Sequence, residues 1–200
     1  MFRSIVALFL LCAGVCHAST ILVFGDSLSA GYGLRADEAW PSLLQKRLKA
    51  EGFPHVVVNA SASGETTAGG KTRLPAALAQ HKPSVVVLEL GANDGLRGLP
   101  LNAMQENLTD MARMAKKAGA KLVLVGMRLP PNYGPAYTEK FQNSFPAVAK
   151  KEGAALVPFL FEGLALSPQM FQADGLHPTA AAQSRLLDNV WPALKTQLKR

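Results

Sequence analysis

Five short apolar runs divide the chain, and amphipathic segments separate them. The runs span residues 21–24, 56–58, 85–90, 122–125 and 155–160, and each is typical of a buried β-strand. Between the runs, apolar side chains recur at helical spacing. These helical faces comprise Trp40, Leu43, Leu44 and Leu48; Leu74 and Leu78; Met104, Leu108, Met111 and Ala115; Phe141, Phe145 and Val148; and Leu187, Val190, Trp191 and Leu194.

The order of these elements predicts an α/β fold. Strands that are rich in Val and Leu and lack polar alternation indicate a parallel sheet buried on both faces. Right-handed crossovers through the intervening helices then give a three-layer α/β/α sandwich with a five-stranded parallel sheet. No internal repeat or linker interrupts the pattern, so residues 19–200 are expected to form a single domain.

Prolines and histidines refine this picture locally. Pro146 and Pro192 lie inside helical patterns and predict a kink or a restart in each helix. Residues 127–135 are rich in Pro and Gly and predict a loop after the fourth strand. His55 precedes a strand and His81 ends a helix, so capping or surface roles are expected for both.

Residues 1–18 have the composition of a secretory signal peptide. Arg3 supplies a positive start, residues 5–15 are almost entirely apolar, and Ala18 ends the segment with a small residue. The apolar run is shorter than the roughly 20 residues that a membrane-spanning helix needs. We therefore predict cleavage after Ala18 and an exported product that is periplasmic or secreted.

The cysteine content and the net charge restrict which sites and partners the mature chain can have. Cys12 and Cys16 both lie in the predicted leader, so the mature chain lacks disulfides, catalytic cysteine and zinc–thiolate sites. Arg3 is the only charged residue of the leader, and its removal lowers the net charge of +7 by one, to +6. This charge allows contact with an anionic membrane surface, and a generally basic solvated surface explains it equally well. No arginine-rich block interleaved with aromatic residues indicates a nucleic-acid partner.

The most informative candidate site residues follow the first predicted strand, in the sequence Gly-Asp-Ser-Leu-Ser at residues 25–29. A glycine there permits a sharp turn, and Ser27 at the start of a helix presents its hydroxyl at the carboxyl edge of the sheet, beside backbone N–H groups. Helix capping alone also explains Gly, Asp and Ser in a βα turn. Ser29 stands where the nucleophile turn of ordinary α/β-hydrolases has glycine, which argues against that fold.

Three further loops bring polar groups to the same edge. Gly64 follows the second strand and can offer an unobstructed backbone N–H, and Asn93 follows the third and can offer a side-chain N–H. Asp174 and His177 are spaced so that the carboxylate can fix the imidazole tautomer and leave Nε2 free to accept a serine proton. Pro178 suits the first position of the next helix. An Asp–Gly turn followed by a helix cap is the alternative interpretation.

Acidic residues also gather in these loops. Asp26, Glu65 and Asp94 are neighbours of the candidate groups, but no histidine joins them at metal-ligand spacing. We interpret them as turn and hydrogen-bonding groups of the site. No metal or other cofactor is expected.

Together, the four blocks resemble the SGNH (GDSL-like) hydrolases in order and spacing. They are Gly-Asp-Ser-Leu-Ser at 25–29, Gly64, Gly-Ala-Asn-Asp at 91–94 and Asp-Gly-Leu-His-Pro at 174–178. The resemblance covers nearly all of residues 19–200 and is strongest to the bacterial periplasmic acyl-CoA thioesterase I, lysophospholipase and arylesterase subgroup. Segments 29–33, 39–41, 73–75, 93–98 and 128–130 are also similar to that subgroup. Ala92 stands where close relatives often have glycine, a difference expected to alter local packing more than chemistry.

The resemblance implies a flavodoxin-like arrangement and a role for each candidate residue. Ser27 would be the nucleophile, His177 the general base and Asp174 its orienting partner. The oxyanion hole would comprise the N–H groups of Ser27 and Gly64 and the side chain of Asn93. The residues expected to contact the substrate are Asp26, Asp94, Leu129 and Pro130.

The resulting prediction is an exported serine esterase that hydrolyses carboxylic esters and thioesters through an acyl-enzyme intermediate. Its expected substrates are fatty-acyl esters, lysophospholipids, acyl thioesters and aryl esters, and a monomer is expected. Since acyl-CoA is an awkward substrate outside the cytoplasm, esters or lysophospholipids are the favoured natural substrates. A carbohydrate (acetyl) esterase is an alternative, because the same fold and triad would serve it. A non-catalytic lipid-binding module of the cell envelope is an alternative of another class.

Overall fold

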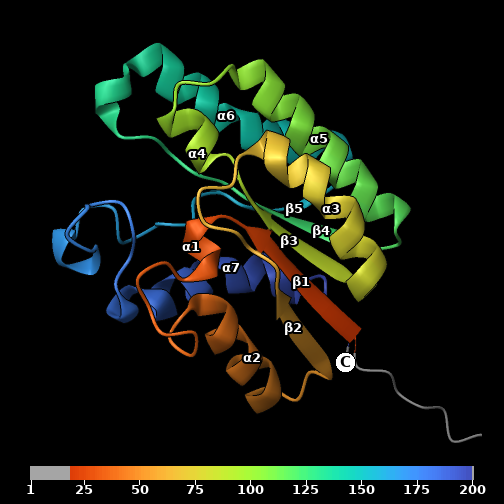
Figure 1. Cartoon of the computed structure of the whole chain (residues 1–200). Coiled ribbons are helices and arrows are strands. Elements are labelled where there is room, and N and C mark those ends of the chain that lie inside the picture. The colour runs from red at the N-terminus through yellow and green to blue at the C-terminus, as the bar shows by residue number, and fades with distance from the viewer. Residues whose placement is uncertain (1–18, 200) are drawn as a thin grey trace, which may run out of the picture.

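A five-stranded parallel sheet forms the centre of the computed structural model, which describes residues 19–199 (Figure 1). Its strands are β1 (Ser19–Gly25), β2 (His55–Asn59), β3 (Val85–Glu89), β4 (Lys121–Val125) and β5 (Ala155–Val157). They lie in the order β2-β1-β3-β4-β5, and each neighbouring pair is parallel. This is the flavodoxin-like, doubly wound order, so the predicted fold class is confirmed.

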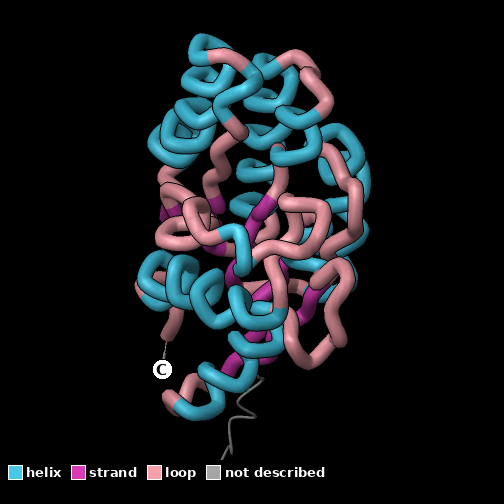
Figure 2. The backbone as a smooth tube through the Cα atoms, turned by 90° about the vertical axis from the view of Figure 1, so that its left-hand side faces the viewer, coloured by secondary structure: helices cyan, strands magenta, loops and turns pink. Residues whose placement is uncertain are grey.

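Helices cover both faces of the sheet and complete the three layers (Figures 1 and 2). One face carries α3 (Thr67–His81), α5 (Leu101–Lys117) and α6 (Pro135–Glu152), and the other carries α2 (Trp40–Ala50) and α7 (Gln183–Lys195). The shorter helical segments are α1 (Ser27–Ala30), α4 (Ala92–Leu96), η1 (Pro131–Tyr133), η2 (Pro168–Met170) and η3 (Ala180–Ala182). Among residues 19–199, no helix has the length and apolar character to cross a bilayer. The predicted signal peptide lies outside the described residues and stays a prediction.

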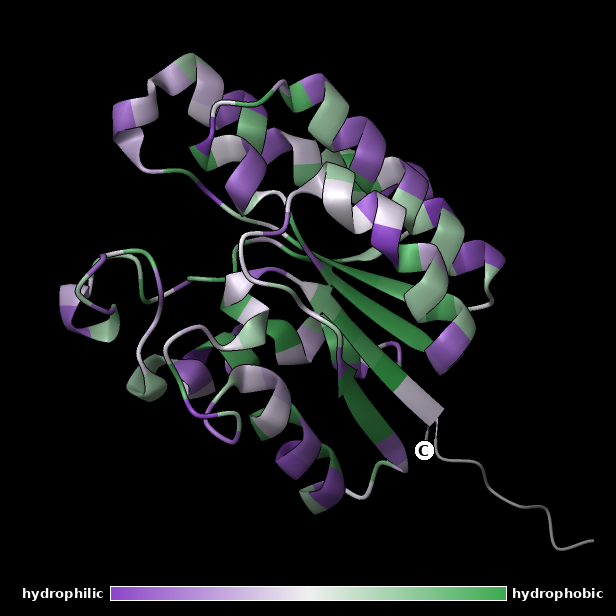
Figure 3. Cartoon of the chain, viewed as in Figure 1, coloured by the Kyte–Doolittle hydropathy of each residue, from purple (hydrophilic) through white to green (hydrophobic). Residues whose placement is uncertain are grey.

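Apart from Glu89 at the end of β3 and Lys121 at the start of β4, the strands β3 and β4 are apolar because helices pack on both faces of the sheet (Figure 3). All five residues of β3 are buried, and so are four of the five in β4. β2 lies at the edge of the sheet, where Val56 is exposed and His55 is buried. The capping or surface role expected for His55 is therefore wrong, whereas His81 ends α3 as predicted.

Two expectations about helix and strand ends need correction. α6 continues through Pro146, and α7 continues through Pro192, so the expected restart is wrong, while the expected kink stays a prediction. Burial of Phe141 and Phe145 on one face of α6 offsets the hydrogen bond that its proline removes. The fifth strand ends at Val157 rather than at residue 160, because a proline follows and the chain turns toward the cavity described below.

Candidate active site

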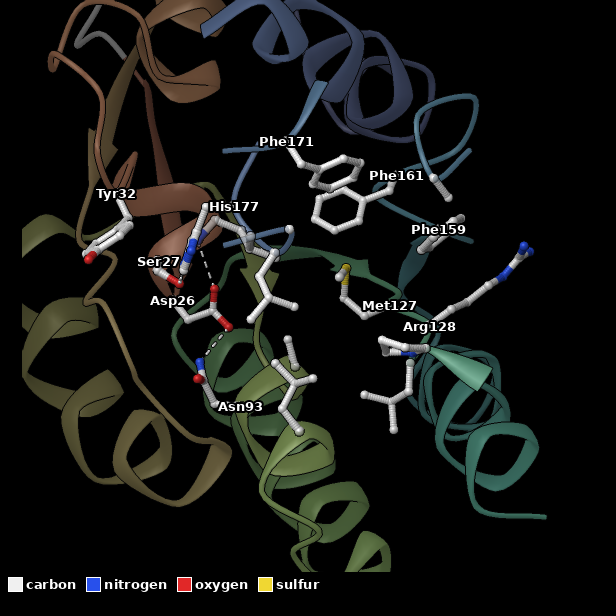
Figure 4. A pocket seen from close by; sticks show the side chains of 18 of the residues that line it. Asp26, Ser27, Tyr32, Asn93, Met127, Arg128, Phe159, Phe161, Phe171 and His177 are labelled. Carbon is white, nitrogen blue, oxygen red and sulfur yellow. Dashed lines mark hydrogen bonds between the residues drawn. The ribbon is translucent and has the colours of Figure 1, made fainter. Parts of the chain in front are cut away.

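Ser27 is the first residue of α1, directly beyond the carboxyl end of β1 (Figure 1). Asp26 caps this helix, since its Oδ1 accepts the N–H of Leu28 at 3.0 Å. The Asn59 side chain also donates to the carbonyl oxygen of Ser29 at 2.8 Å, which ties the turn to the end of β2. These bonds fix the backbone around Ser27, so its hydroxyl faces the cavity (Figure 4).

Ser27, His177 and Asp174 form a continuous line of hydrogen bonds. The Oγ of Ser27 lies 2.9 Å from Nε2 of His177, and the Oδ2 of Asp174 lies 2.7 Å from Nδ1 of the same ring. The Oδ1 of Asp174 also accepts the backbone N–H groups of Leu176 and His177. Those backbone and side-chain bonds from His177 lower the pKa of Asp174 to about 2. The carboxylate therefore stays charged beside the imidazole over the physiological pH range.

The loop that carries His177 is held by strand-like pairing, not by the start of a helix. Phe171 and Pro178 form an isolated antiparallel bridge, and the N–H of Gln172 donates to the carbonyl of His177 at 2.7 Å. The next helical turn begins only at Ala180. Pro178 is thus not a first helical residue, and the prediction that it starts the helix is wrong. The ring centroids of Tyr32 and His177 lie 4.5 Å apart, so the two rings pack against each other.

Gly64 and Asn93 lie on the cavity wall with Ser27, as the sequence predicts. The Nδ2 of Asn93 donates to Oδ2 of Asp26 and to the carbonyl of Glu65, each at 3.0 Å (Figure 4). Gly64 has a φ of +75°, a conformation that favours glycine. The guanidinium of Arg97 donates to the carbonyl of Gly64 at 2.9 Å and restrains this loop. Both residues are therefore held in place in the free enzyme, with both hydrogens of the Asn93 amide already donated.

Asp26 and Asp94 differ in their relation to the cavity. Asp26 lines it although its residue is only 1% exposed, and this burial raises the pKa of Asp26 to about 6. Asp94 does not line the cavity, because its carboxylate accepts the N–H and the hydroxyl of Thr67 at 2.8 and 2.5 Å. Asp94 therefore has the hydrogen-bonding role that we expected. It is not placed to contact a substrate in the cavity.

The cavity beside Ser27 has a volume of about 720 Å³ and a largely apolar lining. Leu129 and Pro130 line it, as expected from the sequence. Met127, Phe159, Phe161 and Phe171 extend it away from His177 (Figure 4). Sequence reasoning did not single out these aromatic residues, because they lie at irregular spacing in the long connection between β5 and α7 and form no local motif. Phe161 and Phe171 pack edge to face, with ring centroids 5.4 Å apart.

Other groups near the site were also not predicted as functional. Arg97, Tyr32 and the buried Glu89 contact its backbone or side chains. The signal for Glu89 was a single acidic residue within an otherwise apolar run at 85–90. In residues 19–199, no group of three or more His, Cys, Asp or Glu side chains could hold a metal ion.

Comparison with known proteins identifies the family. A family model described as the GDSL-like lipase/acylhydrolase family matches residues 23–185. The chain belongs to this family. Esterase TesA of Pseudomonas aeruginosa is 56% identical over 181 residues, which are 90% of this chain and 90% of that protein. Thioesterase 1/protease 1/lysophospholipase L1 of Escherichia coli K12 is 44% identical over 180 residues, or 90% of this chain and 84% of that protein.

The fold of this GDSL-like hydrolase is likewise shared with a solved structure. A crystal structure of TesA matches with a TM-score of 0.88 and 56% identity, covering 90% of this chain and all of the solved one. The predicted family and enzyme class, a hydrolase acting on ester bonds, are thereby confirmed. A non-catalytic lipid-binding module does not fit these relatives.

Proposed function

We propose that this GDSL-like hydrolase cleaves carboxylic esters and thioesters through an acyl-enzyme on Ser27. The supporting observation is the hydrogen-bonded line from Ser27 through His177 to Asp174. The Oγ of Ser27 bonds to the acyl carbon while its proton passes to Nε2 of His177. His177 then gives this proton to the leaving oxygen or sulfur as its bond to carbon breaks. Water then gives a proton to the same imidazole as its oxygen bonds to the acyl carbon. The bond from this carbon to Oγ breaks, His177 returns the proton to Ser27, and the acid is released.

The negative oxygen of each tetrahedral intermediate would be bound by three donors: the N–H groups of Ser27 and Gly64 and the Nδ2 of Asn93. Such donors act strongly because they are oriented before charge develops. In the free enzyme both hydrogens of the Asn93 amide are donated, to Asp26 and to the Glu65 carbonyl, so a bond to the oxyanion would replace one of these two bonds.

The acyl group would lie in the apolar part of the cavity, along Leu129, Pro130 and the aromatic side chains beyond them. An aliphatic chain gains about 0.8 kcal/mol for each CH₂ that it buries there. This lining favours medium or long acyl chains over acetyl groups and hence favours a fatty-acyl esterase over a carbohydrate esterase. Lysophospholipids and acyl thioesters belong to the proposed range, in keeping with the name of the Escherichia coli relative.

We further propose that the protein acts outside the cytoplasm, as a monomer, after cleavage behind Ala18. The leader-like composition of residues 1–18 supports export to the periplasm or beyond. The charge of +6 on the mature chain supports contact with anionic membrane surfaces, where lysophospholipids occur.

Hydrolysis of p-nitrophenyl esters from acetate to palmitate tests the function and its nucleophile together. We expect turnover to peak at medium or long chains and Ser27→Ala to lower kcat by about 10³-fold or more. Ser42→Ala is the matched control, since its hydroxyl binds the Ala36 carbonyl away from the cavity. Turnover confined to acetate would favour the sugar-ester alternative. Unchanged turnover in Ser27→Ala would refute the proposed mechanism.

A further inference from the structure

Glu89 is a fully buried carboxyl group that the mechanism above does not use. It is the last residue of β3 and is 0% exposed. In the sheet it pairs with Gly25, the residue that begins the turn to Ser27. A buried acid with no cationic partner is costly, so its presence directly beneath the nucleophile calls for a physical reason.

Within residues 19–199, the hydrogen bond that the Glu89 side chain makes goes to the turn that carries Ser27. The hydroxyl of Ser29 donates to its Oε2 at 2.7 Å. The backbone N–H groups of Asp26 and Ser29 also act to lower the pKa of this carboxyl, and burial outweighs them. A Cβ atom on Gly25 would lie 2.7 Å from the same Oε2, so only glycine allows the turn to rest on Glu89. The carboxyl thus fills the space below the turn and binds its polar groups.

The charged group that faces Glu89 is Asp26, and His177 and Asp94 in turn act on Asp26. Burial, followed by the charge of Asp26, raises the pKa of Glu89 well above its ordinary value. The second oxygen of Glu89, Oε1, has no hydrogen-bond partner within the described part of the chain. Two adjacent buried carboxyls do not both ionise readily, and an unpartnered charged oxygen would add to the cost.

We propose that Glu89 is a positioning residue that works as a neutral carboxylic acid: it supports the turn bearing Ser27 from below and leaves Asp26 as the charged member of the pair. A charged Asp26 can then orient the Asn93 amide beside the His177 imidazole. This inference rests on the proposed role of Ser27.

Two variants, Glu89→Gln and Glu89→Ala, test separately whether residue 89 supports the turn that carries Ser27 and whether its carboxyl group is charged. The amide keeps an acceptor for Ser29 at the same place, so kcat on a soluble short-chain ester should stay within about threefold of wild type. Glu89→Ala removes the support, and we expect kcat to fall about 10- to 100-fold with little change in KM, because the turn shifts and substrate binding does not. The acid limb of the pH profile of kcat/KM should be the same in wild type and Glu89→Gln, since both leave Asp26 without a charged neighbour at position 89.

Stability provides an independent readout of the charge. In the unfolded chain Glu89 ionises above about pH 4, whereas the fold resists this ionisation, so rising pH stabilises the unfolded state of the wild type. Glu89→Gln lacks that titration. Its urea midpoint should therefore rise relative to wild type as pH increases from about 4 toward 8. Glu152→Gln is the matched control: this buried carboxylate pairs with Arg113 and Lys116, so its variant should not gain stability with pH.

Specific results would overturn either the neutral state of Glu89 or its support of the turn. An acid limb that moves to lower pH in Glu89→Gln, or a midpoint difference that does not grow with pH, would show a charged Glu89 and overturn the proposal. Wild-type kcat in Glu89→Ala would overturn the support role. If Glu89→Ala does not fold, the Glu89→Gln comparison still decides. If the wild type itself lacks ester turnover, the proposed function fails, while the urea curves still test the charge of Glu89.

Discussion

Asp26 and Asp174 carry the same carboxyl group in opposite environments beside one imidazole. Burial raises the pKa of Asp26 to about 6, whereas hydrogen bonds from His177 and Leu176 lower that of Asp174 to about 2. Asp174 therefore keeps its charge at pH values well above about 2, whereas Asp26 gains a proton as pH falls through about 6. Their surroundings, and not their residue type, separate their proposed roles.

The proposed orienting role of Asp174 predicts the effect of Asp174→Asn. The amide oxygen can still accept the backbone N–H groups of Leu176 and His177, so the turn and the thermal midpoint should be preserved. The amide NH₂ would face Nδ1 of His177 and favour the wrong tautomer. We expect kcat/KM on a soluble ester to fall about 10²- to 10⁴-fold. Asp37→Asn, which alters an exposed acid paired with Arg35, should leave kcat/KM unchanged. A loss below tenfold in Asp174→Asn would contradict the orienting role.

Residues that belong to short, ordered motifs could be predicted from the sequence, and residues that meet only in space could not. Ser27, Asn93 and His177 each follow a strand or lie in a recognisable turn, so their common edge could be inferred. In the sequence, Glu89 looks like any other strand residue. Only the structure shows that Gly25 lies against its carboxyl group. The aromatic side chains of the cavity also escaped prediction, because Phe161 and Phe171 meet only where the long connection after β5 folds back on itself.

At the scale of elements, the site lies where the sheet reverses its direction of winding. β1 lies between β2 and β3, and the turns after β1 and β3 carry Ser27 and Asn93. The apolar runs predicted all five strands because both faces of the sheet are buried. A proline alone did not predict the end of a helix correctly. α6 and α7 continue through their prolines because their packing against the sheet offsets the lost hydrogen bonds.

Asp94 joins two of these elements and should therefore affect stability. Its carboxylate, in α4, accepts the N–H and hydroxyl of Thr67 at the start of α3 and is nearly inaccessible to solvent. Asp94→Ala would leave the buried Thr67 groups without this acceptor. We expect the free energy of unfolding, measured with urea, to fall by about 2–4 kcal/mol.

Asp110→Ala provides the control for this measurement. Asp110 pairs with Lys71 between α5 and α3, but this ion pair is exposed to solvent. Its loss should leave the urea midpoint almost unchanged. Equal effects of Asp94→Ala and Asp110→Ala would mean that the buried link between α4 and α3 adds nothing to stability.

On the scale of the whole molecule, exposed apolar side chains gather around the open cavity of a chain that carries a net positive charge. Within residues 19–199, Tyr32, Leu166 and Leu176 are exposed large hydrophobic residues that also line the cavity. Leu166 is 97% exposed, so the folded chain itself does not cover it. A lipid surface would cover such side chains while the positive charge of the protein attracts anionic headgroups.

The proposed membrane contact therefore predicts salt-sensitive vesicle binding by the mature Ser27→Ala chain, which cannot consume the lipid. Co-sedimentation with phosphatidylcholine vesicles containing phosphatidylglycerol should be strong at about 0.01 M ionic strength and weak at about 1 M, where the screening length shrinks from roughly 30 to 3 Å. Adding Leu166→Ser should weaken binding at low salt, because the most exposed apolar side chain no longer enters the lipid. Val56→Ser is the matched control, since Val56 is also exposed but lies on the edge strand β2, outside the cavity. Equal binding to vesicles of pure phosphatidylcholine would rule out attraction by charge, and equal loss in the two apolar variants would show that the cavity mouth is not the contact surface.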